Sequence, residues 1–335
     1  MTYRVAIVGA GVWAQNHLTG WRGQPDAKVT WVVRSTDEGA RATAERWNVE
    51  NHAADWRAVA SRDDVDVVDV LLPHDLHAEA VCFALERGKH VVVEKPLAPT
   101  LRDAQLIVET ARRTGRRVMI SENWIYSTFV RKAKAVIEAG DIGKPFMLRT
   151  VLEMDVRTGF KGLTWRYDPK RMGGGALMDG GTHNISVCRH LLGEIESVAA
   201  AQGSFVFTDF APLEDAIVVL MRFANGALGT LSIAWGAQRE RPRSEFTILG
   251  SEGTIEFDTH QRSFLLSRDG TRRESVDLQA SRGFVEQMRH FLDCLKNGSE
   301  PTTSPDEQIG SLKAILAAYR SAQSGAFVPT NSVID

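Results

Sequence analysis

The first 124 residues alternate short apolar runs with segments of helical periodicity. Each run is nearly continuous in hydrophobicity, as expected for strands that are covered on both faces of a parallel sheet. Alternation of such strands with helices predicts a doubly wound α/β domain over residues 1–124. The predicted strands are Arg4 to Val8, Val29 to Val33, Val65 to Leu72, His90 to Glu94 and Arg117 to Ser121.

The pattern changes after Trp124. A predicted helix from Phe129 to Ala139 stops at Gly140, and longer strands with alternating residues follow. Alternation is typical of antiparallel strands with one covered face, so residues 125–335 are expected to form an α+β domain with a large, mostly antiparallel open sheet. The predicted strands are Glu196 to Phe207, Asp215 to Phe223, Gly226 to Trp235, Ser244 to Leu249 and Thr254 to Asp258, followed by helices near Phe284 to Lys296 and Pro305 to Ser324.

Length and charge narrow the possible classes of protein. A chain of 335 residues exceeds the size of most single cores, which favours two domains. Forty basic and 42 acidic side chains, with no basic arm, leave no electrostatic footprint for nucleic acid. No apolar run is long enough to span a membrane, and no secretory leader is recognisable, so a cytoplasmic location is expected. The cysteines, Cys82, Cys188 and Cys294, are too far apart for a metal or redox pair.

A glycine-rich turn follows the first predicted strand directly and opens a helix. The pattern G-x-G-x-x-A from Gly9 to Ala14 has the context in which it indicates dinucleotide binding rather than a simple turn. Gly9 would permit the tight turn, Gly11 would let the backbone approach the pyrophosphate, and Ala14 would allow close packing. Val12 and Trp13 complete the predicted phosphate-binding turn.

The end of the second predicted strand bears on the choice of nucleotide. Arg34, Ser35 and Thr36 stand where NAD-binding proteins usually place an acidic residue for the ribose hydroxyls. A guanidinium with neighbouring hydroxyls suits a 2′-phosphate, which favours NADP(H). NAD(H) stays possible if Arg34 is only a solvated charge and Asp37 reaches the ribose.

Two further motifs carry residues suited to chemistry. Lys95 lies at the carboxyl end of a predicted parallel strand, the edge where ligands bind in open sheets. The glycines at 173–175 indicate close approach of a backbone to a ligand, and they lead into a predicted helix with Asp179 and His183 four residues apart on one face. Taken singly, Lys95 could be an ordinary surface lysine and His183 a structural histidine.

Together these motifs resemble the family of glucose-fructose oxidoreductase, inositol 2-dehydrogenase and the rhizopine-catabolism proteins (Gfo/Idh/MocA). The resemblance rests on the turn at Gly9–Ala14, the triplet Glu94-Lys95-Pro96 and the block from Gly173 to His183, and it extends over nearly the whole chain. It implies a Rossmann domain, a second domain whose open sheet commonly serves in oligomer contacts, and hydride transfer at a sugar or cyclitol carbon. It also implies a Lys95–Pro96 bond that is often cis.

The resemblance further implies that Lys95 is the catalytic lysine and that Asp179 and His183 complete a triad. Alcohol oxidation requires removal of the hydroxyl proton while hydride leaves the same carbon. His183 is the expected proton acceptor, since imidazole exchanges protons near neutrality. Lys95 would hold the reacting oxygen and stabilise its developing charge, and Asp179 would orient His183 or a substrate hydroxyl.

Other residues join the candidate site with weaker support. Trp165 and Arg166 could give a sugar an aromatic face and hydrogen-bond donors, or could be a core residue and a paired surface charge. Asn123 is a candidate substrate contact, although Glu122-Asn123-Trp124 departs from the Asn-Arg-aromatic pattern that is frequent in the family.

Pro73, His74, His77, Glu94 and Lys95 are candidate cofactor contacts through the resemblance. The spacing His74-x-x-His77 could also suggest a metal site, but no cysteine or H-E-x-x-H partner accompanies it, and no metal is expected.

The sequence therefore predicts an NAD(P)-dependent sugar or cyclitol dehydrogenase or reductase that acts on a small polyhydroxylated substrate as a homo-oligomer, either a dimer or a tetramer. Two alternatives stay open. One is an NAD-dependent glycosidase that oxidises a sugar transiently and eliminates a substituent. The other is a dinucleotide-sensing regulator, which would not need Lys95, Asp179 and His183 together.

Overall fold

The computed structural model describes residues 2–157, 164–207, 210–238, 244–258, 263–268, 271–275 and 280–334. These residues pack into two compact units. The first comprises Met1–Asn123 and Gly283–Ile309, and the second comprises Trp124–Arg282 and Gly310–Asp335. The sequence predicted a single domain boundary near residue 124. In the structure, the later segment Gly283–Ile309 also belongs to the first unit.

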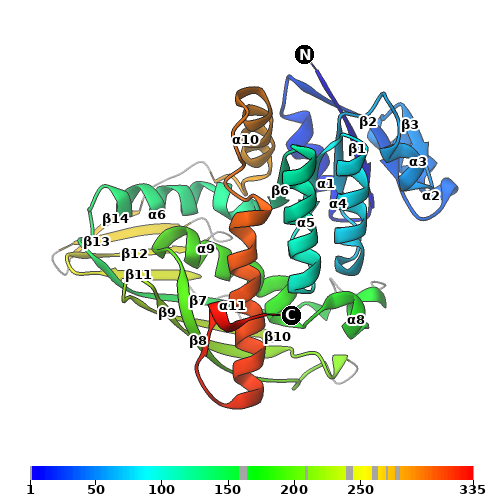
Figure 1. The fold of residues 1–335 in the computed structure, drawn as a ribbon. Coiled ribbons are helices and arrows are strands. Elements are labelled where there is room, and N and C mark those ends of the chain that lie inside the picture. Colours follow the sequence, from blue (N-terminus) through cyan, green and yellow to red (C-terminus); the bar gives the residue numbers. More distant parts are fainter. Residues whose placement is uncertain are drawn as a thin grey trace. The chain divides into compact units, whose positions relative to one another are not determined.

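The first unit contains a six-stranded parallel sheet in the order β3-β2-β1-β4-β5-β6, which confirms the predicted doubly wound Rossmann-like architecture. Helices α4 and α5 pack side by side, and α1 packs against α10 (Figure 1). The elements up to residue 126 are β1 (Tyr3–Val8), α1 (Ala14–Arg22), β2 (Ala27–Val33), α2 (Asp37–Trp47), β3 (Asn51–Ala53), α3 (Trp56–Ala60), β4 (Val67–Val70), the 3-10 helix η1 (His74–Leu76), α4 (His77–Glu86), β5 (His90–Glu94), α5 (Leu101–Thr114), β6 (Val118–Ser121) and the 3-10 helix η2 (Asn123–Tyr126).

Close packing on α1 explains why α10 (Phe284–Asn297) joins the first unit. A Cβ atom added at Gly20 would lie 2.5 Å from the Phe284 carbonyl oxygen, so the two backbones nearly touch. The rings of Trp21 and Phe291 meet edge to face at 6.4 Å, and Gln24 Nε2 donates to the Val285 carbonyl at 2.8 Å. Aromatic and backbone contacts of this kind fix a helix far from its sequence neighbours.

The second unit contains a nine-stranded sheet in the order β14-β13-β12-β11-β7-β10-β9-β8-β15. Its pairs are antiparallel except for β7 with β10, as predicted for a large, mostly antiparallel sheet. Helices α6 and α9 pack together and against β12 and β7 (Figure 1). Besides α10, the elements after residue 126 are α6 (Thr128–Glu138), β7 (Pro145–Met154), the 3-10 helix η3 (Thr164–Tyr167), α8 (Pro169–Met172), the π-helix η4 (Leu177–Gly181), α9 (Thr182–Leu192), β8 (Ile195–Gly203), β9 (Ala216–Phe223), β10 (Leu228–Trp235), β11 (Phe246–Gly250), β12 (Gly253–Asp258), β13 (Ser263–Arg268), β14 (Thr271–Ser275), α11 (Pro305–Ser324), β15 (Val328–Pro329) and the 3-10 helix η6 (Thr330–Ser332).

One predicted strand ends earlier than expected. β8 stops at Gly203, whereas the apolar run suggested that it continues to Phe207. The backbone amides of Phe205, Val206 and Phe207 donate to the buried carboxylate of Asp215 at 2.7–3.0 Å. A side-chain acceptor therefore takes the place of a neighbouring strand here.

One face of the large sheet carries exposed apolar side chains. Val218 and Leu220 on β9 alternate with buried residues, and Leu228 lies opposite Arg222 across the β9–β10 pair. In the described part of the chain, no helix has both the length and the apolar character needed to cross a membrane.

Candidate functional site

The glycine-rich turn between β1 and α1 exposes its backbone. Gly9 has φ +87°, and a Cβ atom there would lie 2.4 Å from the Leu71 carbonyl oxygen, so only glycine fits. At Gly11 an added Cβ would meet nothing nearer than 3.9 Å. Val12 is 94% exposed and Trp13 40%, while Ala14 is buried as α1 begins. This open cradle at a helix N-terminus fits the pyrophosphate of a dinucleotide.

Arg34 leaves the end of β2 as an exposed residue beside the start of α2. Its Nη1 donates to Thr43 Oγ1 at 3.2 Å, which holds the guanidinium along the first turns of the helix. Thr36 caps α2 by accepting from Gly39 N, and Ser35 is exposed. Asp37 lies 3.8 Å from His52 Nε2. The Arg34 guanidinium, considered for a 2′-phosphate, and the Asp37 carboxylate, considered for the ribose hydroxyls, therefore both lie near the end of β2.

Lys95 follows the last residue of β5, at the carboxyl end of the parallel sheet, and the Lys95–Pro96 bond is cis, as the family resemblance implied. The Glu94 carboxylate organises this strand end. Its Oε1 accepts from Trp13 Nε1 at 2.9 Å, and its Oε2 accepts from the Lys95 amide at 3.2 Å. One carboxylate thus joins the glycine-rich turn to the candidate catalytic lysine.

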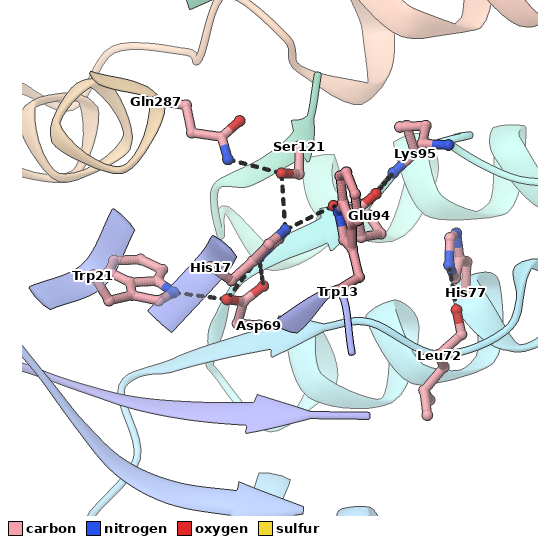
Figure 2. A network of polar contacts seen from close by, with 10 residues as sticks. All are labelled: Trp13, His17, Trp21, Asp69, Leu72, His77, Glu94, Lys95, Ser121 and Gln287. Atoms are coloured by element: carbon pink, nitrogen blue, oxygen red, sulfur yellow. Dashed lines mark hydrogen bonds and ion pairs between the residues drawn. The ribbon is translucent and has the colours of Figure 1, made fainter. Parts of the chain in front are cut away.

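A buried histidine that the sequence did not single out binds the same carboxylate (Figure 2). His17 Nε2 lies 2.7 Å from Glu94 Oε1, and His17 Nδ1 lies 2.9 and 3.0 Å from the two oxygens of Asp69. Trp21 Nε1 donates to Asp69 at 2.7 Å, and Ser121 Oγ lies 3.2 Å from His17 Nε2. Burial lowers the pKa of His17, but the two carboxylates outweigh burial and raise it to about 10.

His74 and His77 begin the segment after β4, and both are buried. The His77 nitrogens lie 2.9 Å from the carbonyl oxygens of Pro96 and Leu72, so backbone oxygens occupy both. A cofactor contact from the His77 ring is therefore not proposed, whereas His74 and Pro73 stay predicted contacts. No cluster of three or more metal-ligating side chains occurs among the residues that the structure describes.

In the second unit, a buried carboxylate shapes the glycine run. Glu214 accepts from the amides of Gly175 and Leu177 at 2.9 Å and from the Tyr319 hydroxyl at 2.9 Å. A Cβ atom on Gly175 would lie 2.1 Å from the Glu214 carbonyl oxygen, so this glycine is required by packing. Burial raises the pKa of Glu214. The sequence suggested that a ligand explains these glycines, but Gly175 packs against Glu214 of the protein itself.

The predicted helix that carries Asp179 and His183 is present, but it begins with a π-helical turn that continues directly into α9. Asp179 belongs to the π-helix η4, and His183 lies in the first turn of α9. Added Cβ atoms would lie 2.8 Å from the Leu152 side chain at Gly180 and 2.4 Å from the Ile233 side chain at Gly181, so both glycines pack closely against side chains of the sheet. π-helical turns are frequent at functional sites.

Asp179 and His183 each have a partner from a separate segment. Arg166 forms an ion pair with Asp179, and its guanidinium also lies 4.8 Å from the centre of the Trp165 ring. The His183 ring stacks on Trp124, with centroids 4.7 Å apart and planes 10° apart. In the second unit, Arg166 thus contacts both Asp179 and Trp165, and His183 contacts Trp124.

Each unit thus assembles part of the candidate site. Gly9–Ala14, Glu94 and Lys95 meet in the first unit, and Arg34 stands at the end of a neighbouring strand. Asn123 is buried at the end of the first unit. Sequence reasoning missed His17, Asp69, Trp124 and Glu214. Asp69 carried a readable signal, since it is a lone carboxylate within the strand Val67–Val70.

Comparison with known proteins gives consistent matches over both units. Residues 3–122 match the oxidoreductase family with an NAD-binding Rossmann fold, and residues 130–256 match the GFO/IDH/MocA C-terminal domain. A D-apiose dehydrogenase of Paraburkholderia graminis is 28% identical over 99% of this chain and 90% of its own length. A levoglucosan dehydrogenase of Pseudarthrobacter phenanthrenivorans is 29% identical over 78% of this chain and 75% of its own length.

A solved structure of levoglucosan dehydrogenase with NADH and levoglucosan has the same fold. The TM-score is 0.91 at 24% identity, with 99% of this chain and 100% of the other covered. Curated relatives include an enzyme named for NADP⁺ and another named for NAD⁺.

Proposed function

The chain belongs to the Gfo/Idh/MocA family of NAD(P)-dependent oxidoreductases, and we propose that it transfers a hydride between a nicotinamide nucleotide and a carbinol or ketone carbon of a sugar, sugar derivative or cyclitol. The observation that carries this proposal is the bonding of Glu94 to both Trp13 and Lys95. The cradle for the dinucleotide and a lysine suited to polarise a substrate oxygen are thereby built on one rigid sheet edge.

The chemistry divides among three side chains. A nicotinamide nucleotide bound at the turn from Gly9 to Ala14 would accept or supply the hydride. Lys95 Nζ binds the reacting oxygen and stabilises its developing negative charge, which is a large effect in a water-excluded site. The His183 imidazole accepts the hydroxyl proton on oxidation and returns it on reduction. Asp179, paired with Arg166, orients His183 or a neighbouring substrate hydroxyl.

The relatives suggest the class of substrate. Enzymes named for D-apiose and for levoglucosan act on small sugars or sugar derivatives, and other relatives are inositol dehydrogenases. The exposed part of Tyr167 and the half-buried Trp165 could offer aromatic faces to such a ring. Trp165, Arg166 and Asn123 stay predicted substrate contacts.

A screen with both nucleotides tests the function. Pentoses, anhydrosugars, inositols and their keto derivatives are incubated with NADP⁺, NAD⁺ or the reduced forms, and the absorbance of reduced nicotinamide is followed. Turnover of at least one compound is expected. Turnover of none would reject the dehydrogenase, and loss of a glycosidic substituent without net change in nicotinamide would identify the glycosidase instead.

We expect NADP(H) to be preferred through Arg34. Replacing Arg34 with alanine removes a charge-assisted contact to the 2′-phosphate and should raise KM for NADP⁺ about 10- to 100-fold. KM for NAD⁺ should change little, because NAD⁺ has no phosphate there. Arg46→Ala, at the far end of α2, is the matched control. Equal losses for both nucleotides would remove the 2′-phosphate argument.

We also propose a homo-oligomer that buries the exposed sheet face of Val218, Leu220 and Leu228. Leu220→Glu places a charge on that face and should lower the molar mass measured by light scattering. Leu106→Glu changes an exposed leucine on α5 and should leave the mass unchanged. An unaltered mass for the Leu220 variant would place any interface elsewhere.

A cytoplasmic location stays a prediction. The three cysteines, Cys82, Cys188 and Cys294, all have free thiols in the structure, which agrees with a reducing compartment.

A further inference from the structure

We propose that two buried histidines, His17 and His77, are positioning residues for Lys95, which they hold through the residues on either side of it. The inference rests on the proposed function, since it assigns these histidines a purpose in placing the lysine for hydride transfer. Neither ring is exposed, so neither touches substrate itself. Figure 2 shows both rings around the end of β5.

The geometry of His17 favours a doubly protonated ring. Nδ1 faces the Asp69 carboxylate at 2.9 Å and Nε2 faces the Glu94 carboxylate at 2.7 Å. Carboxylate oxygens only accept when ionised, so both ring nitrogens must donate for both contacts to be favourable. The other polar group at the ring is Ser121 Oγ, which accepts from Gln287 Nε2 at 2.9 Å. The imidazolium therefore supplies the positive charge between two buried carboxylates.

This charge fixes Glu94 on the amino-terminal side of Lys95. A buried carboxylate is stable when it is paired and fully hydrogen-bonded, and Glu94 receives donors from His17, Trp13 and the Lys95 amide. Asp69 is in turn held by Trp21. The line from Asp69 through His17 to Glu94 thus ties β4 and α1 to the backbone amide from which the lysine side chain starts.

His77 fixes the carboxyl-terminal side. Its ring lies between the carbonyl oxygens of Pro96 and Leu72, at 2.9 Å from each. Both oxygens only accept, so a ring nitrogen that carries a proton donates to the oxygen that it faces. Burial lowers the pKa of the His77 ring. The ring thus lies between the residue after Lys95 and the segment that follows β4.

A lysine that polarises a reacting oxygen must be placed within a fraction of an ångström of its productive position. Lys95 lies between Glu94 and Pro96, and each of these two residues has a buried histidine nitrogen within hydrogen-bond distance. Loss of either histidine should therefore reduce the rate of the chemical step more than the binding of nucleotide or substrate.

The protonation of His17 is tested first, without substrate. In the full-length protein labelled with ¹⁵N-histidine, both ring nitrogens of His17 are expected to keep the chemical shifts of an imidazolium from pH 6 to pH 9. The His17 signals are assigned by their loss in His17→Gln. A ring that loses its proton within this range would overturn the assigned role of His17.

The positioning role is tested with His17→Gln, His77→Gln and the control His90→Gln, which changes the opposite end of β5. For both test variants kcat should fall about 10²-fold, while KM and the dissociation constant of NADPH change little. The control should keep the kcat of the natural protein. Test variants that fold and retain its kcat would overturn the proposal, as would losses confined to KM.

Acetylation of Lys95 by acetic anhydride, measured against pH by peptide mass spectrometry, gives a readout that needs no turnover. His17→Gln leaves Asp69 and Glu94 without the cation between them, so the pH midpoint for Lys95 should rise relative to the natural protein and the control. An unchanged midpoint rejects the role of His17. If no sugar is turned over but the midpoint moves, the proposed function fails while the link to Lys95 stands. If His17→Gln does not fold, Asp69→Asn replaces it, because this variant removes one of the two carboxylates that stabilise the imidazolium. His17 should then lose its proton between pH 6 and pH 9, and the pH midpoint for acetylation of Lys95 should change at the same pH.

Discussion

Lys95→Ala is expected to lower turnover about 10³-fold while leaving nucleotide binding nearly intact. The amine is the candidate group that stabilises negative charge on the reacting oxygen, and loss of one preorganised donor of this type costs about 10²- to 10³-fold in kcat. The glycine-rich turn that cradles the pyrophosphate does not depend on the lysine side chain, because Glu94 binds Trp13 and the Lys95 backbone amide. Steady-state rates and NADPH titrations measure the two effects separately.

Lys89→Ala is the matched control, because Lys89 precedes the same strand and donates to the Arg62 carbonyl at 2.5 Å. That variant should retain most of the turnover. Comparable activity in Lys95→Ala and the natural protein would show that another group polarises the oxygen. A parallel loss of NADPH affinity would instead indicate that the lysine is needed for the fold of the turn.

The central strands of the first unit could be predicted from the sequence because they are buried on both faces of the sheet. Continuous apolar runs mark β1, β4 and β5, whereas the order of the strands in the sheet was not predicted. The short edge strand β3 (Asn51–Ala53) gave no such signal, because only half-buried residues form it. Hydrophobicity thus predicts central strands better than edges.

The second unit was harder to predict, since polar residues occupy inward positions there. β7, at the centre of the large sheet, was not anticipated, although Leu148, Thr150 and Leu152 point alternately inward. Thr150 breaks the apolar pattern, and its hydroxyl accepts from Asn184 at 2.7 Å. A hydrogen bond to a residue 34 positions away satisfies this threonine, and no local rule could reveal it.

The candidate site shows the same division. The sequence identified candidate residues that belong to a motif or directly follow a predicted strand, namely Gly9, Arg34, Lys95, Asp179 and His183. The groups that hold them depend on tertiary contacts. His17 lies between the carboxylates of Asp69 and Glu94, which are 52 and 77 positions away in the sequence. Trp124 stacks on His183, which is 59 positions away.

The free energy of unfolding of the natural protein should depend on pH through His17, and His17→Gln should lack this dependence. The pKa of His17 is raised from 6.5 to about 10 in the folded state, so the folded protein binds the proton more tightly than the unfolded chain. Its contribution is fully present below pH 6.5 and is lost as pH rises towards 10. The rise corresponds to at most about 5 kcal/mol in the free energy of unfolding. Denaturant unfolding at pH 6 and pH 10 should therefore separate the two proteins widely at the lower pH and bring them closer at the higher.

His90→Gln again supplies the control. Burial and the neighbouring Arg116 and Arg117 lower the pKa of His90 to about 4, so this ring is neutral in folded and unfolded protein above pH 7. The stability difference between this variant and the natural protein should be flat from pH 7 to pH 10, and it should change only as the pH falls from 6.5 towards 4. If the His17→Gln difference were also flat above pH 7, the ring would be neutral in the folded state. One of the two carboxylates, Asp69 or Glu94, would then have to carry the shared proton.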